Sequence, residues 1–136
     1  MSNKFINDVS SNTYSVKPVV VINNNLYLST HSLNIDGVTT YNIVKDIPRV
    51  SEKIELLEEG AIQIPYLSIS LINYGKSIEG YKTFSALYGD RGLSDKSIDV
   101  YYISQSINTL EEAVKVFTGF IRKAKHTKQI FTIEAE

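Results

Sequence analysis

The chain has 136 residues, of which 43% are hydrophobic and 21% are charged, and its formal net charge at pH 7 is −1. This size and composition are those of one ordinary globular domain, and the near-zero charge excludes a general electrostatic attraction to nucleic acid or acidic membranes. The absence of cysteine excludes disulfides, thiolate catalysis and cysteine-ligated metals.

Residues 1–16 are polar and predict either a flexible arm or an arm that orders against a neighbouring subunit. Phe5, Ile6 and Val9 would be the anchors of such an arm. The segment has no long apolar core and no small-residue cleavage site, so we expect no signal peptide. Residues 17–136 are then expected to form a single domain.

The first predicted strand is residues 19–22, which are all β-branched. This run is too short to cross a bilayer, and no membrane insertion is expected. The asparagines at 23–25 favour a tight turn because asparagine tolerates left-handed backbone angles. Residues 26–30 alternate like a strand, which predicts a hairpin. A turn at Asp36-Gly37 then precedes a β-rich stretch at 38–44 that could form a further strand.

The middle of the chain predicts two more strands. Residues 51–57 have both a possible helix cap and a strand alternation, and we interpret them as a strand. Residues 62–74 are strongly β, with leucine and isoleucine alternating with serine, so one face can cover a core. One short helical turn is predicted at 83–88, with Phe84 and Leu87 facing inward.

The last third of the chain predicts a strand at 98–103, a short helix near 109–115 and a hairpin. Thr109 and Glu112 have the spacing of a capping box, in which the hydroxyl and the carboxylate each satisfy a backbone amide. Residues 116–127 and 129–136 then form the two strands of the hairpin, joined by a cationic turn. Its second strand places three apolar side chains on one face: Phe131, Ile133 and Ala135.

The tally is about seven or eight strands with one or two short helices. This pattern predicts an all-β (or β-rich α+β) fold, a single β-barrel or sandwich, rather than alternating strands and helices.

A search for chemistry finds no catalytic, cofactor or metal motif. His31 and His126 are the only histidines, and neither has a partner at metal-ligand spacing. Gly75-Lys76-Ser77 resembles the end of a phosphate-binding loop, but Ser70 stands where that loop needs a glycine. We therefore expect no enzyme activity, no metal and no cofactor; an active site assembled only by folding is kept as an alternative.

The one concentration of charge is a run of four cations in the C-terminal hairpin: Arg122, Lys123, Lys125 and Lys128. They form either a solvated turn that discourages edge-to-edge pairing or a contact surface. As a contact surface they favour a protein over nucleic acid, because no aromatic ladder accompanies them. The chain also has nine tyrosines, and of the adjacent pair Tyr101 and Tyr102 one must point outward, where tyrosine is enriched at interfaces.

Residues 62–136 also resemble a known group of proteins. The features that carry the resemblance are, in chain order, the serine-faced strand at 62–74, the phrase YKTFSALYGD, Val100-Tyr101-Tyr102, Thr109-Leu110-Glu111-Glu112, the F-x-G-x-I strand at 117–121 and the returning F-T-I-E. This phrasing resembles β-barrel domains of tailed-bacteriophage tail-hub, distal-tail and baseplate proteins.

The resemblance implies a structural virion protein of the phage tail, assembled in the host cytoplasm, with no catalytic residues to carry over. It would form a ring with copies of itself and join other tail proteins, through edges and aromatic side chains that become buried on assembly. The expected interface residues are Phe5, Ile6, Val9, Tyr101, Arg122, Lys123, Lys125 and Lys128. The alternative is a small monomeric β-module that binds a carbohydrate or a peptide.

Overall fold

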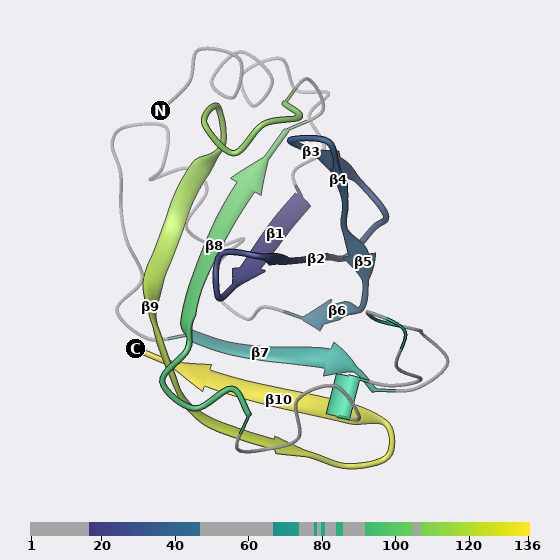
Figure 1. Cartoon of the computed structure of the whole chain (residues 1–136), viewed down its shortest axis with the longest axis vertical. Helices are drawn as coiled ribbons and strands as arrows, with labels where there is room; N and C mark the ends of the chain where they lie inside the picture. Colours follow the sequence, from purple (N-terminus) through teal and green to yellow (C-terminus); the bar gives the residue numbers. More distant parts are fainter. Residues whose placement is uncertain are drawn as a thin grey trace.

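The computed structural model describes residues 17–46, 67–73, 78, 80, 84–85, 92–104 and 107–136. The predicted arm, with Phe5, Ile6 and Val9, and the strand predicted at 51–57 lie outside these residues. Within the described residues the chain forms ten strands (Figure 1): β1 (Lys17–Ile22), β2 (Leu26–Ser29), β3 (Asn34–Ile35), β4 (Val38–Thr39), β5 (Tyr41–Asn42), β6 (Val44–Asp46), β7 (Leu67–Ile72), β8 (Ser97–Ile103), β9 (Val114–His126) and β10 (Ile130–Ala135).

Eight of these strands form one sheet in the order β5-β2-β1-β8-β9-β10-β7-β6, and β3 pairs with β4 alone. The two edge strands, β5 and β6, are consecutive in the chain, with only the buried Ile43 between them. Ile43 also accepts a hydrogen bond from the amide of Ile72 in β7 (2.7 Å). The sheet is therefore a nearly closed barrel, which confirms the predicted all-β fold with about eight paired strands.

Strand β9 connects the two halves of the barrel. Its first half pairs with β8 and its second half with β10, and Figure 1 shows it curving from one to the other. In the first half, Val100 faces Phe117 while Tyr101 faces Lys115, so Val116 is an extra, bulged residue. Bulges bend a strand and increase its twist, which lets one strand serve both halves of a barrel.

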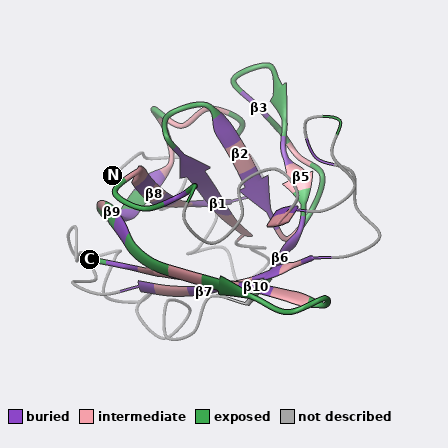
Figure 2. Cartoon of the chain, turned by 60° about the horizontal axis from the view of Figure 1, so that its bottom comes forward, coloured by how far each residue is buried: buried purple, intermediate pink, exposed green. Residues whose placement is uncertain are grey.

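The core follows the predicted alternation along β7 and β10. Apolar side chains on alternate positions are buried (Figure 2): Leu67, Ile69, Leu71, Phe131, Ile133 and Ala135. Phe84, which has helical backbone geometry as predicted, is also fully buried. Its ring meets the ring of Phe131 edge-on, with centroids 4.7 Å apart. The remaining residues of the turn predicted at 83–88 lie outside the described residues.

The hairpin of β1 and β2 is confirmed. Asn23 and Asn24 have φ of 54° and 60°, the left-handed conformation that asparagine tolerates. The amide of Asn25 donates to the carbonyl of Ile22 (3.2 Å) and closes the turn. The hairpin register pairs Ile22 with Leu26 and Val20 with Leu28, so these four side chains share one buried face, and Val19 and Val21 on the other face are buried as well.

The short helix predicted near 109–115 is wrong, because residues 109–113 form a turn and residues 114–115 already belong to a strand. Thr109 does meet Glu112, its hydroxyl donating to the carboxylate (3.2 Å), and the amide of Ala113 donates to the carbonyl of Leu110 (3.2 Å). Strand β9 begins at Val114, directly after this turn. One turn cannot offset the cost of helix nucleation, whereas the strand pairs along β8.

The stretch at 38–44 is divided among three short strands instead of forming one. Thr40 is buried between β4 and β5; its hydroxyl donates to the carbonyl of His31 (2.7 Å) and accepts from the amide of Leu33 (2.8 Å). These bonds interrupt the strand and redirect the chain toward the parallel pairing of β5 with β2. The turn predicted at Asp36-Gly37 is confirmed, with φ of 54° and 81°.

Gly119 on β9 leaves room for the backbone of Glu136, with which Phe120 exchanges two hydrogen bonds (3.0 and 3.1 Å). A Cβ atom at position 119 would lie 2.7 Å from the carbonyl oxygen of Glu136. We therefore expect Gly119→Ala to lower the free energy of unfolding by about 1–3 kcal/mol in urea denaturation. The exposed Lys123 on the same strand is the control, since its alanine variant should change stability by no more than about 0.5 kcal/mol. Equal losses would contradict the steric explanation.

Candidate functional site

The four cations of the predicted interface lie on the second half of β9 and in the turn after it, and all four are exposed. Glu134 faces Lys123 while Ala135 faces Ile121, so Arg122 is the extra residue of a second bulge. The bulge exposes Arg122 and Lys123 in succession. The hairpin therefore presents a cationic surface, as predicted.

Arg122 differs from the three lysines because it is held by its neighbours. Its guanidinium donates to the carboxylate of Asp95 (3.1 Å) and lies 3.9 Å from the carboxylate of Glu136. It also lies over the ring of Phe120, 5.7 Å from the centroid. These side chains are exposed, so each ion pair adds at most about 1 kcal/mol. Their effect is to orient Arg122 beside Phe120.

Phe120 was not among the predicted interface residues, although it is the most exposed large apolar side chain among the described residues, at 49%. Its neighbours Phe117 and Ile121 are buried, and Gly119 meets Glu136. The F-x-G-x-I pattern already places Phe120 on the face opposite to Gly119 and Ile121. This alternation could have identified Phe120 as exposed, because a side chain on the outer face of a strand does not pack in the core.

Tyr101 does not join the cations. It faces Lys115 at the start of β9, whereas the cations lie at the other end of that strand. Its ring is half-buried against the core, and the ammonium of Lys115 lies 5.4 Å from the ring centroid. Tyr102 is the buried member of the pair, so the prediction that one of the two points outward is confirmed. The predicted interface residues thus occupy two separate surfaces.

Tyr27 lies on the same face of the sheet as Tyr101, two strands away. Burial raises the pKa of Tyr27 above its ordinary value of 10.0, and the charges of Asp36 and Tyr101 raise this pKa further. A raised pKa in the folded state contributes stability below about pH 10 that is lost as the pH rises through the folded pKa. We expect ultraviolet titration of the folded protein to show a late-titrating tyrosine that is missing from Tyr27→Phe. Matching high-pH curves for both proteins would contradict this assignment.

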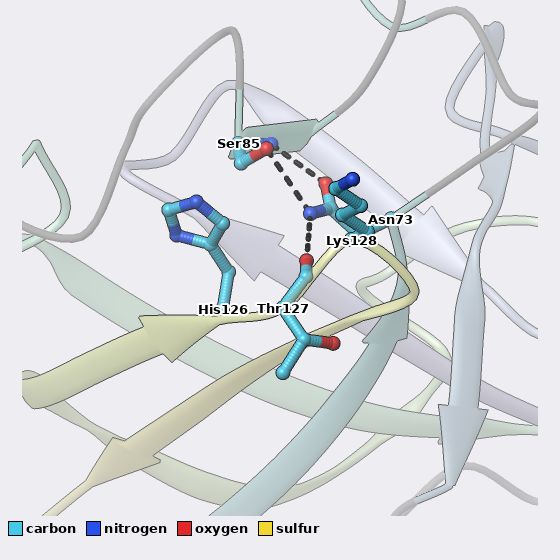
Figure 3. Close-up of a pocket in the computed structure, with 5 residues that line it drawn as sticks. All are labelled: Asn73, Ser85, His126, Thr127 and Lys128. Carbon is cyan, nitrogen blue, oxygen red and sulfur yellow. Dashed lines mark hydrogen bonds between the residues drawn. The ribbon is translucent and has the colours of Figure 1, made fainter.

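A pocket of about 430 Å³ lies at the turn of the β9–β10 hairpin (Figure 3), lined by Asn73, Ser85, His126, Thr127 and Lys128. Asn73 is buried and its side chain joins three segments. Its amide nitrogen donates to the hydroxyl of Ser85 (3.0 Å) and to the carbonyl of Thr127 (2.8 Å), and its oxygen accepts from the amide of Ser85 (2.9 Å). The pocket wall is therefore a hydrogen-bonded scaffold.

His126 is the last residue of β9, and its ring stacks on that of Phe131, with centroids 5.8 Å apart and planes inclined by 7°. Lys128 gives one side of the pocket a positive charge, and the imidazole of His126 adds a polar ring beside it, so the arrangement suits a polar ligand better than an apolar one. Among the residues that the structure places, no three His, Asp or Glu side chains gather as a metal site.

In the described part of the chain, none of the helical segments has the length and apolarity needed to traverse a bilayer. No protein-family model, curated protein or solved structure proved similar to this chain. The functional argument therefore rests on the resemblance within the sequence and on the surfaces and the pocket of the barrel.

Proposed function

We propose that this chain is a structural subunit of a bacteriophage tail, at the baseplate, hub or tail-tube level. It forms a ring with copies of itself and joins neighbouring tail proteins. Its role is shape and charge complementarity rather than catalysis. The resemblance of residues 62–136 to tail-barrel domains supports this proposal, and the barrel fold is consistent with it.

The observation that carries the proposal is the exposed Phe120 with Arg122 beside it on β9. Aromatic residues and arginine are enriched at protein–protein contacts, and a few such residues account for most of the binding energy. Lys123 and Lys125 continue this surface toward the hairpin turn. A half-exposed phenylalanine within a charged strand suits a surface that becomes covered in an assembly.

A second candidate function is supported by the hairpin pocket. A small monomeric β-module that binds a carbohydrate or a peptide would use its polar lining, with Asn73 holding the walls. The pocket has the volume of an ordinary small-molecule site. Binding in this pocket requires no second copy of the chain.

The mass of the particle in solution separates the two functions. Light scattering at micromolar concentration, followed by negative-stain imaging of the same peak, should show rings or discs for a tail subunit. Phe120→Ala should then shift the mass toward the monomer without loss of folding. A monomer of 15.3 kDa at every concentration, together with glycan binding, would instead favour the second function.

A further inference from the structure

Opposite charges lie at opposite ends of β9. Three lysines at the end of the strand and in the turn after it form what we call the basic hairpin: Lys123, Lys125 and Lys128. Three carboxylates of the two loops near the start of the strand form the acidic rim: Asp36, Glu111 and Glu112. Figure 1 shows the turn after β3 and the loop before β9 at one end of the molecule, and the β9–β10 turn at the other.

The acidic rim is a built surface because hydrogen bonds hold its two loops together. The amide of Asp36 donates to the carbonyl of Asn108 (3.0 Å), and the Asp36 carboxylate accepts from the amide of Leu110 (3.4 Å). Glu112 accepts from Thr109 within the second loop. Two of the three carboxylates, those of Asp36 and Glu112, are therefore held in place on the barrel end, and the exposed Glu111 is next to Glu112 in the second loop.

Beside the rim is a pocket of about 100 Å³ with mostly apolar walls, lined by Lys17, Leu33, Asn34, Ile35, Ile103, Ser104 and Ile107. The hydroxyl oxygen of Ser104 is buried, and among the described residues it has no hydrogen-bond partner. A buried hydroxyl without a partner carries a desolvation cost that an incoming polar group can remove. Lys17 is already engaged in an interaction of its own. The pocket therefore combines an apolar wall, an available hydroxyl and an acidic border.

A lysine side chain matches this combination, because its aliphatic stem packs on apolar surface while its ammonium group stays at a polar edge. The basic hairpin of the same copy cannot reach the rim. The two surfaces lie at opposite ends of the molecule (Figure 1), and Lys123 follows Glu112 by eleven residues, up to about 36 Å of strand and several Debye lengths at physiological salt. The matching lysines must come from another molecule.

We propose that the basic hairpin of one copy docks on the acidic rim and the adjoining pocket of a second copy. This inference rests on the proposed function, in which copies of the chain assemble. The contact joins two different surfaces of the same protein, so it is head-to-tail, and head-to-tail contacts close into rings when the rotation between copies permits.

Charge exchange in the full chain tests the contact. We would reverse the charge of the basic hairpin with Lys125→Glu and Lys128→Glu, and leave Lys123 unchanged because it faces Glu134. A second variant would reverse the charge of the acidic rim with Glu111→Lys and Glu112→Lys. Asp36 is left unchanged because it holds the two loops together. The control is Lys45→Glu, which reverses the charge of one exposed lysine on β6, outside both surfaces. Circular dichroism would establish that each variant is folded before its mass is measured by light scattering.

We expect each reversed variant alone to self-associate about tenfold more weakly than the wild type, and an equimolar mixture of the two to recover the assembly. The control should assemble like the wild type, and added salt should dissociate wild type and mixture alike. Wild-type rings that survive both reversals, or a mixture that stays monomeric, would overturn the inference while leaving the ring proposal intact. A wild-type protein that never assembles would overturn both.

Discussion

Replacing Phe131 by alanine is expected to lower the free energy of unfolding by about 3–5 kcal/mol. Phe131 is fully buried on β10, and its ring contacts that of Phe84 edge-on and that of His126 face-on. Its removal takes a large apolar group out of the core and leaves a cavity between β10 and the segment that contains Phe84. The rigid barrel wall limits how far the neighbours can move into that space.

Urea denaturation followed by circular dichroism measures this loss as a lower midpoint at an unchanged slope. The matched control is Phe120→Ala, which deletes the same side chain from a position that is 49% exposed and should cost less than about 1 kcal/mol. If Phe131→Ala is too unstable to fold, Phe131→Leu leaves a smaller cavity and should still cost about 1–2 kcal/mol. Equal losses at positions 120 and 131 would contradict the assignment of Phe131 to the core.

The elements that the sequence predicted well are those set by local rules. The β1–β2 hairpin depends on asparagines that occupy left-handed conformations, and β7 and β10 depend on strict alternation across a half-buried sheet. In each case the residues that determine the structure are neighbours in the chain. The same holds for the exposed cations of the β9–β10 hairpin.

The elements that it did not predict depend on distant partners. Thr109 and Glu112 meet as a capping pair should, yet no helix follows, because Val114 begins the pairing with β8. The two bulges of β9 appear only in its registers with β8 and β10. Nor does any local pattern indicate that β5 pairs in parallel with β2 and so nearly closes the barrel.

The candidate sites divide in the same way. The cationic hairpin is a sequence-local feature and was predicted, whereas the pocket beside it is formed by Asn73, Ser85 and Thr127, which are separated by up to 54 residues. Phe120 was missed although the alternation of the F-x-G-x-I segment places it on the face opposite to the buried Ile121. A charged hairpin can therefore be predicted from the sequence more readily than a pocket whose walls come from residues far apart in the chain.

Asn73→Ala is expected to lower the free energy of unfolding by about 2–4 kcal/mol and to loosen the hairpin turn. The substitution removes two donors and one acceptor from a side chain that is only 2% exposed. It leaves the carbonyl of Thr127 and the amide of Ser85 without their partners at 2.8 and 2.9 Å. Asn73 itself is buried, whereas Ser85 is half-buried and Thr127 is exposed, so the expected loss comes mainly from the three hydrogen bonds that the Asn73 amide forms out of contact with water.

Hydrogen exchange gives this prediction its local signature. In Asn73→Ala the amide of Ser85 should exchange faster relative to those of the β1–β2 hairpin, because its acceptor is gone while β1 and β2 are unaffected. Asn42→Ala is the control: Asn42 is exposed at the end of β5, and its removal should change stability by no more than about 0.5 kcal/mol. If both asparagine variants unfold at the same urea concentration, Asn73 does not hold the three segments together. The hairpin pocket would then have no fixed wall, and the case for a ligand-binding module would weaken with it.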